Sequence, residues 1–260
     1  MSNTFSNISP KAKIGKEVKI ESFVSISDDV EIGDGCWIGS NVTIMDGARI
    51  GNNCKIFPGA VISAIPQDLK FGGEKSIVKI GDNTTVREFA TINRATNFSG
   101  VTSIGENCLI MAYVHVAHDC QIANNVVLVN SVQLGGHVEI AEHAIIGGIS
   151  AIHQFVKIGS HAMISGGSLV RKDVPPYIKV AKEPLSFIGI NSIGLSRKGF
   201  SEEKILEIQN IYRSIFQSNL NYTQALEKIK NEFPKNDEIN NIIKFISESE
   251  RGIIKGYKQQ

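Results

Sequence analysis

The aliphatic residues of this 260-residue chain recur with a period of six. Isoleucine occupies every sixth position from Ile8 to Ile62, and aliphatic residues keep the same phase over 80–92 and 104–170. A second, small residue stands four places after most of these positions. An α-helix repeats every 3.6 residues and a plain strand alternates in twos, so neither explains a period of six. The pattern instead predicts a β-helix, in which short strands joined by turns stack in successive coils.

The long aliphatic residue and the small residue of each repeat are expected to point into a narrow interior. Three repeats per coil and left-handed coiling are typical of the left-handed parallel β-helix, which is the fold class that we predict. The chain has 39 Ile and 10 Leu, and β-branched side chains favour strands. All four cysteines occupy the small inward position, so we expect core residues in a reducing compartment rather than disulfides or zinc ligands: Cys36, Cys54, Cys108 and Cys120.

Two segments interrupt the repeat, at 63–79 and 95–103. Both carry Gly together with polar residues, and we expect them to form loops extruded from the coil, where repeat proteins commonly bind ligands. The repeat ends at Pro175-Pro176, because consecutive prolines cannot continue the pairing of strands. We therefore predict a β-helix over 1–182 and a small α-helical C-terminal domain over 183–260.

The C-terminal region changes to helical spacing. Ser201 is a predicted N-cap before a helix with Ile205 and Ile208 on one face, and further helices are predicted to open at Thr223 and Asp237. Such a domain would cover the last coil and block end-to-end association.

The charge and the remaining composition exclude several classes of function. Lys plus Arg number 27 and Asp plus Glu 26, and this balance argues against a nucleic-acid partner, which requires a basic face. The N-terminus lacks a basic region followed by an apolar run, and no stretch approaches the roughly 20 apolar residues of a membrane span. We therefore expect a soluble, cytoplasmic protein.

All six histidines lie between residues 115 and 161. With 18 residues per coil, residues i and i+18 stack about 4.8 Å apart in neighbouring strands. This spacing places His118 beneath Gly136 and Gly136 beneath Gln154, with Asp119 beneath His137. Two more histidines are expected beside this column, His153 on it and His115 at the preceding corner. The other two, His143 and His161, stack on a different face and are expected to be structural.

The column suggests general-base chemistry. A neutral imidazole can take a proton from a sugar hydroxyl near pH 7, and Asp119 can orient it. The backbone N–H of Gly136 could stabilise an oxyanion. No Ser or Cys nucleophile is evident beside His118, which favours direct transfer. A zinc site formed by His115, His118 and His137, as in the γ-class carbonic anhydrases, remains an alternative, as does a non-catalytic binding β-helix.

The chain resembles the UDP-N-acetylglucosamine O-acyltransferases, which catalyse the first step of lipid A synthesis. The segments that carry the resemblance are 67–74 (QDLKFGGE), 115–120 (HVAHDC), 134–138 (LGGHV), 145–149 (IIGGI), 152–155 (IHQF), 173–177 (DVPPY) and 195–200 (LSRKGF). The resemblance implies transfer of an (R)-3-hydroxyacyl chain from acyl carrier protein to the 3-hydroxyl of UDP-N-acetylglucosamine. It also implies a homotrimer with active sites between adjacent β-helices, and neither metal nor other cofactor.

The resemblance also assigns roles to residues. His118 is the general base, Asp119 supports it, and the Gly136 N–H stabilises the thioester oxyanion. The implied substrate-binding residues fall into three groups. Those near the nucleotide sugar are Gln67, Asp68 and Lys70; those lining the donor or acceptor site are His115, His137, His153 and Gln154; those meeting the uridine diphosphate or the phosphopantetheine are Asn191, Arg197 and Lys198. Gly166 matches the position that limits acyl-chain length, and its lack of a side chain predicts room for a long chain.

Three positions depart from the family pattern. Asn93 stands where many relatives have His, Ile193 where a Glu is common, and Lys198 where a second Arg is common. Lys cannot copy a bidentate Arg contact. Because of these three departures together, an amino-substituted analogue of the sugar nucleotide stays open as the acceptor. The related N-acylating family carries an extra N-terminal uridine-binding domain, whereas here the repeats begin at Ile8, so that activity is not expected.

Overall fold

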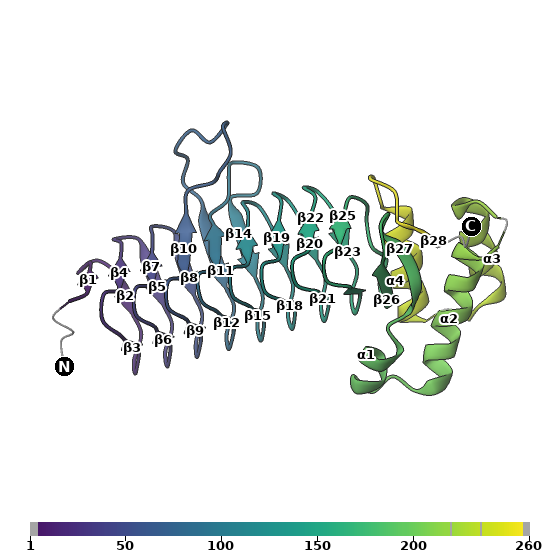
Figure 1. Ribbon diagram of the computed structural model, residues 1–260, viewed down its shortest axis with the longest axis horizontal. Coiled ribbons are helices and arrows are strands. Elements are labelled where there is room, and N and C mark those ends of the chain that lie inside the picture. Colours follow the sequence, from purple (N-terminus) through teal and green to yellow (C-terminus); the bar gives the residue numbers. More distant parts are fainter. Residues whose placement is uncertain (1–4, 219, 235, 257–260) are drawn as a thin grey trace.

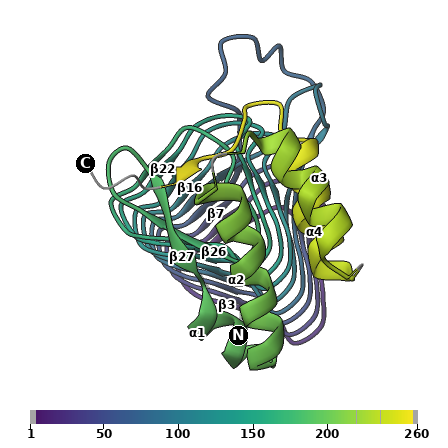
Figure 2. The same ribbon diagram turned by 90° about the vertical axis from the view of Figure 1, so that its right-hand side faces the viewer.

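The computed structural model describes residues 5–218, 220–234 and 236–256. Most of the chain winds into a row of coils that ends in a group of helices (Figure 1). Each regular coil contributes one short strand to each of three parallel sheets, and the coils stack into a three-sided prism when viewed along its axis (Figure 2). The predicted fold class, a left-handed parallel β-helix of hexapeptide repeats followed by C-terminal helices, is confirmed.

The three sheets are called A, B and C here, in the order in which the chain visits them. Sheet A contains β1 (Asn7–Ile8), β4 (Ser25–Ile26), β7 (Thr43–Ile44), β10 (Val61–Ala64), β13 (Thr91–Asn93), β16 (His115–Val116), β19 (Gln133–Leu134), β22 (Ala151–Ile152) and β25 (Leu169–Val170). Sheet B contains β2 (Lys13–Ile14), β5 (Val30–Ile32), β8 (Ala48–Ile50), β11 (Ile77–Ile80), β14 (Val101–Ile104), β17 (Gln121–Ile122), β20 (Glu139–Ile140) and β23 (Lys157–Ile158). Sheet C contains β3 (Lys19–Ile20), β6 (Trp37–Ile38), β9 (Lys55–Ile56), β12 (Thr85–Val86), β15 (Leu109–Ile110), β18 (Val127–Leu128), β21 (Ile145–Ile146), β24 (Met163–Ile164), β26 (Ile178–Ala181), β27 (Ser186–Ile190) and β28 (Lys255–Gly256).

The corners of the prism are named by the sheets that they join, so the AB corner lies between a strand of sheet A and the next strand of sheet B. Both extruded loops leave the prism at this corner, between β10 and β11 and between β13 and β14 (Figure 1). They span 65–76 and 94–100. The first is shorter at both ends than the predicted 63–79, because β10 extends to Ala64 and Ile77 and Val78 already pair with β14. The second begins before the predicted 95 and ends before 103, where β14 starts at Val101.

The interior matches the pattern predicted from the repeat. From Val24 to Val170, outside the two loops, the aliphatic position and the small position four residues later are buried, as Val114 and Val116 illustrate at 0% exposure. In the first coil these positions are exposed or only partly buried, as Ile8 and Ile14 show. Burying one such aliphatic side chain contributes about 1.5–3 kcal/mol, so the repeat itself supplies the stability of the prism. All four cysteines are buried at the small inward positions.

In the part of the chain that the structure describes, four helices follow the coils: α1 (Ser192–Arg197), α2 (Glu202–Phe216), α3 (Tyr222–Glu232) and α4 (Asp237–Ser247). Ser201 caps α2 as predicted, its hydroxyl accepting from the Lys204 N–H at 3.2 Å. Helix α3 begins one residue before Thr223, because Asn221 is the N-cap and forms a capping box with Gln224. The short helix α1 was not predicted. Among the described residues, no helix has the length and apolar character needed to span a bilayer.

Sheet C continues beyond the last coil. Strand β27 pairs antiparallel with β26, and β28, near the C-terminus, adds to β27. Helix α2 packs against this extension: Phe187 stacks on Phe216 at 4.7 Å between ring centroids, and the fully buried Tyr212 donates to the Pro176 carbonyl at 2.7 Å. The division at 182/183 stays a prediction, and the region after it contains these strands as well as helices.

Candidate active site

A column of polar residues runs along the AB corner in the middle of the prism. His118 and Asp119 follow β16, and Gly136 and His137 follow β19, the neighbouring strand of sheet A. The two strands pair in a register of 18 residues, so Gly136 stacks on His118 and His137 on Asp119. The stacking predicted from the length of the coil is therefore present.

Asp119 positions the imidazole of His118. Nδ1 of His118 lies 2.7 Å from Oδ2 of Asp119, and the two side chains are 15% and 0% exposed. The same carboxylate accepts hydrogen bonds from the 94–100 loop, through the backbone N–H and the hydroxyl of both Thr96 and Ser99. The Asp119 N–H in turn donates to the Thr102 hydroxyl at 2.8 Å. The loop thus folds over the carboxylate and fixes it.

These contacts decide the ionisation of Asp119. Burial alone would raise the pKa of this carboxyl, but hydrogen bonds from Ser99, His118 and Thr96 outweigh burial and hold the pKa below its ordinary value. An ionised carboxylate accepts the Nδ1 proton of His118 and leaves a free lone pair on Nε2. Nε2 is therefore the atom that can take a proton from a substrate hydroxyl.

Gly136 lies directly against this imidazole. A Cβ atom at Gly136 would stand 2.6 Å from Cε1 and 2.7 Å from Nε2 of His118, distances that real Cβ atoms essentially never show. Only glycine leaves room for the ring. Among the described residues, none accepts a hydrogen bond from the Gly136 N–H, so this donor is available beside the imidazole. The corner therefore pairs a proton acceptor with an unused backbone donor.

Aromatic side chains wall the site beside His118. The His137 ring stacks on Phe155 at 4.3 Å and meets Phe98, from the 94–100 loop, edge-on at 4.5 Å. It also meets the His118 ring edge-on at 5.0 Å. Burial lowers the pKa of His137, which favours its neutral form near pH 7, and its Nδ1 is buried without a partner among the described residues.

His115 lies in β16 and not at the predicted preceding corner, because the two-residue strand begins at this residue. Its Nδ1 is 2.8 Å from the Thr91 hydroxyl in the neighbouring strand β13. Burial, with a smaller contribution from the charge of His118, lowers the pKa of His115. Its imidazole is thus a neutral polar group on sheet A, just before the His118 corner.

The 65–76 loop carries the three residues predicted to reach the nucleotide sugar. Asp68 is half-buried and its carboxylate accepts from the Lys70 N–H at 3.0 Å, whereas Gln67 and Lys70 are exposed. The charge of Asp68 raises the pKa of His137 against the larger effect of burial, which places this carboxylate near the aromatic wall.

Glu74 joins the two loops. Its carboxylate accepts from the Gly72 N–H at 2.8 Å and from the Asn97 N–H at 3.2 Å, while the Ser76 hydroxyl donates to the Ala95 carbonyl. Sequence reasoning missed this residue and the hydroxyl groups that hold Asp119. The register rule does not extend into the loops, and the only available signal was the set of hydroxyl residues in the second interruption, Thr96, Ser99 and Thr102.

The next coil continues the column. Gln154 and Phe155 follow β22, and the Phe155 N–H donates to the Gly136 carbonyl at 3.0 Å. Both Gln154 and His153 are exposed at the corner. Their positions agree with the predicted stacking, so both lie beside the site.

The remaining predicted residues lie elsewhere in the chain. Asn191 is buried, caps α1 by accepting from the Gly194 N–H at 3.3 Å and donates to the His161 carbonyl at 2.9 Å, at the BC corner. Burial lowers the pKa of His161 to about 4, with smaller contributions from the charges of His143 and Lys198. Lys198 therefore stands near the same corner, whereas Arg197 is exposed in the last turn of α1. Gly166 lies against Gly148 at the CA corner. One chain does not bring these four residues to His118: Gly166, Asn191, Arg197 and Lys198.

The same corner holds a candidate set of metal ligands. Among the described residues, one group of His and Asp atoms lies close enough to hold an ion, within 4.8 Å, and it comprises His118, Asp119 and His137. The group differs from the alternative zinc triad, because it lacks His115. The Asp119 carboxylate already accepts five donors, and an ion would have to displace them.

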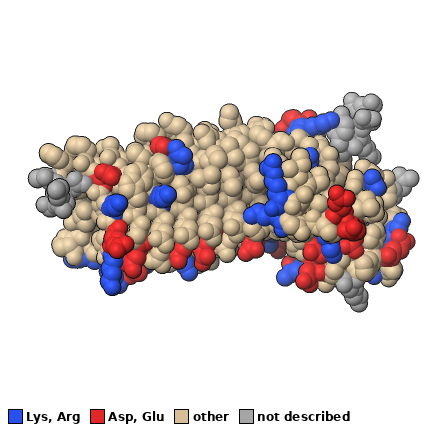
Figure 3. All heavy atoms as spheres, turned by 90° about the horizontal axis from the view of Figure 1, so that it is seen from below, with Lys and Arg blue, Asp and Glu red and all other residues tan. Residues whose placement is uncertain are grey.

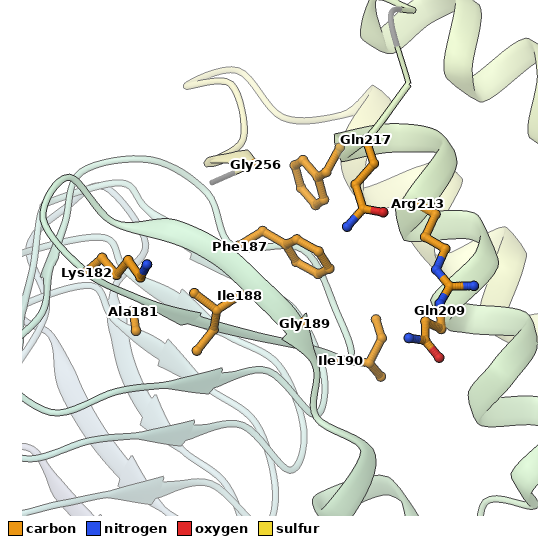
Figure 4. A pocket seen from close by; sticks show the side chains of 11 residues that line it. Ala181, Lys182, Phe187, Ile188, Gly189, Ile190, Gln209, Arg213, Gln217 and Gly256 are labelled. Atoms are coloured by element: carbon orange, nitrogen blue, oxygen red, sulfur yellow. The ribbon is translucent and has the colours of Figure 1, made fainter. Parts of the chain in front are cut away.

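The His118 side chain is 15% exposed at this corner. A cavity of about 710 Å³ lies far from it, between β27 and α2, with Phe187, Ile188, Gln209 and Arg213 among its lining residues (Figure 4). It contains none of the predicted site residues. On the face shown in Figure 3, charged side chains gather near the ends and along one edge of the prism, and much of its middle is uncharged.

Comparisons with known proteins identify the family of the chain. A family model described as UDP-N-acetylglucosamine O-acyltransferase, domain 2, matches residues 173–254, and the bacterial transferase hexapeptide model matches 29–64 and 102–136. The acyl-[acyl-carrier-protein]–UDP-N-acetylglucosamine O-acyltransferase of Sulfurihydrogenibium sp. is 52% identical over 95% of this chain and 91% of its own length. That of Thermodesulfovibrio yellowstonii is 45% identical over 95% and 96%. The crystal structure of a UDP-N-acetylglucosamine acyltransferase from Bacteroides fragilis is 50% identical, with a TM-score of 0.97 over 98% of this chain and 100% of that one. The chain therefore belongs to the UDP-N-acetylglucosamine O-acyltransferase family.

Proposed function

We propose that this protein transfers an (R)-3-hydroxyacyl chain from acyl carrier protein to the 3-hydroxyl of UDP-N-acetylglucosamine, the first step of lipid A synthesis. Family membership supports the reaction, since the curated relatives carry the names of both substrates. The single observation that carries the mechanism is the free Nε2 of His118 beside the unused N–H of Gly136.

The chemistry follows from these two groups. Nε2 of His118 takes the proton of the sugar 3-hydroxyl as its oxygen attacks the thioester carbon. The negative charge that develops on the carbonyl oxygen is stabilised by the Gly136 N–H. When the tetrahedral intermediate collapses, the C–S bond breaks and the His118 imidazolium returns its proton to the departing sulfur. The ester and the free thiol of the carrier are the products.

Asp119 supports both halves of this cycle. Its carboxylate holds the Nδ1 proton of His118, so that the lone pair faces the substrate, and it stabilises the imidazolium formed after the attack. The loop hydroxyls of Thr96 and Ser99 keep it ionised. A general base of this type contributes roughly 10²- to 10⁴-fold to the rate.

We further propose that the active form is a homotrimer whose sites lie between neighbouring prisms. Several large apolar side chains stand exposed at the CA corner: Phe23, Phe89, Tyr113 and Ile149, at 53–77% exposure. Such a row of exposed apolar residues is typical of an interaction surface. Gly166 belongs to the same corner. If the CA corner of one prism packs against the AB corner of its neighbour, Gly166 of the first chain lies beside His118 of the second. The same packing would bring Lys198 of the first chain toward that histidine.

The acceptor and donor sites are proposed to use the predicted residues around this cleft. Asp68, Lys70 and His137 would surround the sugar, and Arg197 and Lys198 the phosphates, because cations suit anionic partners. The amino analogue of the sugar remains the second possible acceptor. The reaction is proposed to need no metal or other cofactor and to run in the cytoplasm, in keeping with four unpaired buried cysteines.

The test is a product assay with (R)-3-hydroxyacyl carrier proteins of several chain lengths, using UDP-N-acetylglucosamine and its 3-amino analogue in parallel. We expect an ester product with the first acceptor, and a preference for long chains because of Gly166. The absence of product from every pair would contradict the proposed function. Light scattering of the same sample should give three times the mass of the chain, and a monomeric mass would contradict the trimer.

A further inference from the structure

The C-terminal segment returns to the AB corner one coil beyond the candidate site. Asp173, which is 1% exposed, holds it there: the Ser249 hydroxyl donates to the Asp173 carboxylate at 2.6 Å, and the Ile254 N–H donates to the Asp173 carbonyl at 3.0 Å. The Asp173 N–H donates to the Gly252 carbonyl at 3.2 Å. Residues 249–254 are thus fixed to the prism at both ends of a short bend.

Arg251, in the middle of this bend, reaches back to the site. Its Nη2 lies 3.2 Å from Nδ1 of His153. Its Nε is buried and donates to no described residue. A guanidinium has five N–H donors and no acceptor, so this contact is a hydrogen bond only when Nδ1 of His153 carries a lone pair. A neutral His153 that accepts from Arg251 therefore carries its proton on Nε2.

A second contact of His153 Nδ1 competes with the contact to Arg251 and favours the other tautomer. Nδ1 of His153 also lies 3.1 Å from the Gln154 carbonyl oxygen, and a proton on Nδ1 would be donated there. The two hydrogen bonds exclude each other, because one needs a lone pair on Nδ1 and the other a proton. Without Arg251, the Gln154 carbonyl would favour the opposite tautomer, with the lone pair on Nε2.

The surroundings are cationic. The next coil places Arg171 and Lys172 18 residues after His153 and Gln154, as the pairing of β22 with β25 requires. Lys172 Nζ approaches Gly252 of the bend, and Arg171 pairs with Glu183 at 3.2 Å. Three cations, Arg171, Lys172 and Arg251, thus gather on the column that carries His118, and cations suit a phosphate. Of the two carboxylates beside them, that of Glu183 pairs with Arg171 and that of Asp173 is buried and accepts from Ser249 and from the Lys157 N–H.

We propose that Arg251 is a positioning residue of this enzyme. It holds His153 in the tautomer that presents an Nε2–H, and this N–H and the guanidinium together bind a phosphate oxygen of a substrate. The inference rests on the proposed function. Both substrates of that function carry phosphate, the nucleotide in its diphosphate and the carrier in its phosphopantetheine arm.

The test compares full-length wild type with Arg251→Ala, Arg251→Gln and Arg251→Lys, and with Lys228→Ala as a control that removes an exposed cation of α3. KM and kcat are measured for UDP-N-acetylglucosamine, for hydroxyacyl-phosphopantetheine and for hydroxyacyl-pantetheine, which lacks the phosphate. We expect Arg251→Ala to raise one KM about tenfold or more, with kcat within about twofold. A rise for the nucleotide identifies the diphosphate, and a rise for the phosphorylated donor alone identifies the carrier arm. Arg251→Lys should restore part of the loss.

The tautomer is read independently from ¹⁵N spectra of histidine-labelled protein, with the His153 signals assigned by their loss in His153→Gln. We expect the Nε2-protonated pattern in wild type and in Arg251→Gln, whose amide can still donate to Nδ1, and the opposite pattern in Arg251→Ala. Unchanged KM values in all Arg251 variants of an active enzyme would overturn the inference, as would an identical His153 spectrum in Arg251→Ala. If wild type makes no product, the proposed function fails, and the spectra still decide the tautomer.

Discussion

Replacing Gly136 by Ala tests how closely the site is built around the His118 ring. The added Cβ would lie 2.6 Å from Cε1 of His118, whereas ordinary contacts begin at 3.4 Å, so the ring must retreat by about 0.8 Å. A retreat of this size breaks or bends the 2.7 Å hydrogen bond to Asp119 and moves Nε2 away from the substrate hydroxyl. Misplacement by about 1 Å can cost 10²-fold in rate, equivalent to about 2.7 kcal/mol.

The assay is initial-rate ester formation by Gly136→Ala, with Gly72→Ala as the matched control, because a Cβ there meets only the Glu74 side chain at 3.6 Å. We expect kcat to fall about 10²-fold in the first and to stay within about twofold in the second. Alanine keeps the N–H of residue 136, so the loss would come from the displaced ring. Adding Gly136→Ala to a His118→Ala enzyme should then cost nothing further. Full activity in Gly136→Ala, or additive losses in the double variant, would refute the reasoning.

Three further predictions concern the same site. His118→Ala should lower kcat by 10²- to 10⁴-fold while circular dichroism and the oligomeric mass stay unchanged; wild-type turnover would end the general-base mechanism. Ser99→Ala removes a donor that holds the pKa of Asp119 down, so that pKa should rise and the acid limb of the pH–rate profile should move to higher pH; an unmoved limb would contradict the role of the loop. The stabilisation from ionised Asp119 is present above its ordinary pKa of 3.8 and is lost as the pH falls below that value. In Ser99→Ala the free energy of unfolding should therefore fall less steeply with decreasing pH in that range. Prolonged dialysis against a chelator should leave kcat unchanged, and recovery of lost activity on adding zinc would favour the metal alternative.

The fold was predictable because every repeat satisfies the same physical constraint, which is the narrow interior of the coil. Every coil must place a long aliphatic and a small side chain in the same narrow interior, so Ile110 and Val114 repeat the choice made at Ile38 and Val42. The same constraint fixes the register, and the register alone predicts that Gly136 stacks on His118. Sequence position thus becomes spatial position wherever the coil is regular.

Contacts made by segments outside the regular coils could not be predicted from the sequence. The 94–100 loop has no period, so its hydroxyl residues could be seen in the sequence, but their contact with the Asp119 carboxylate, made by Thr96 and Ser99, could not be placed from it. Helix α1 is too short to show a helical period, and its cap at Asn191 depends on the distant His161 carbonyl. The role of Arg251 was not predicted either, because its contact with His153 spans 98 residues and depends on the buried Asp173, which holds the C-terminal segment in place.

The most direct measurement is a crystal structure of the enzyme with UDP-N-acetylglucosamine bound. The proposed mechanism requires the sugar 3-hydroxyl oxygen within about 2.6–3.2 Å of Nε2 of His118, on the side where the Gly136 N–H remains free for the thioester oxygen. A sugar bound at another corner, or with its 3-hydroxyl turned away from His118, would contradict the account.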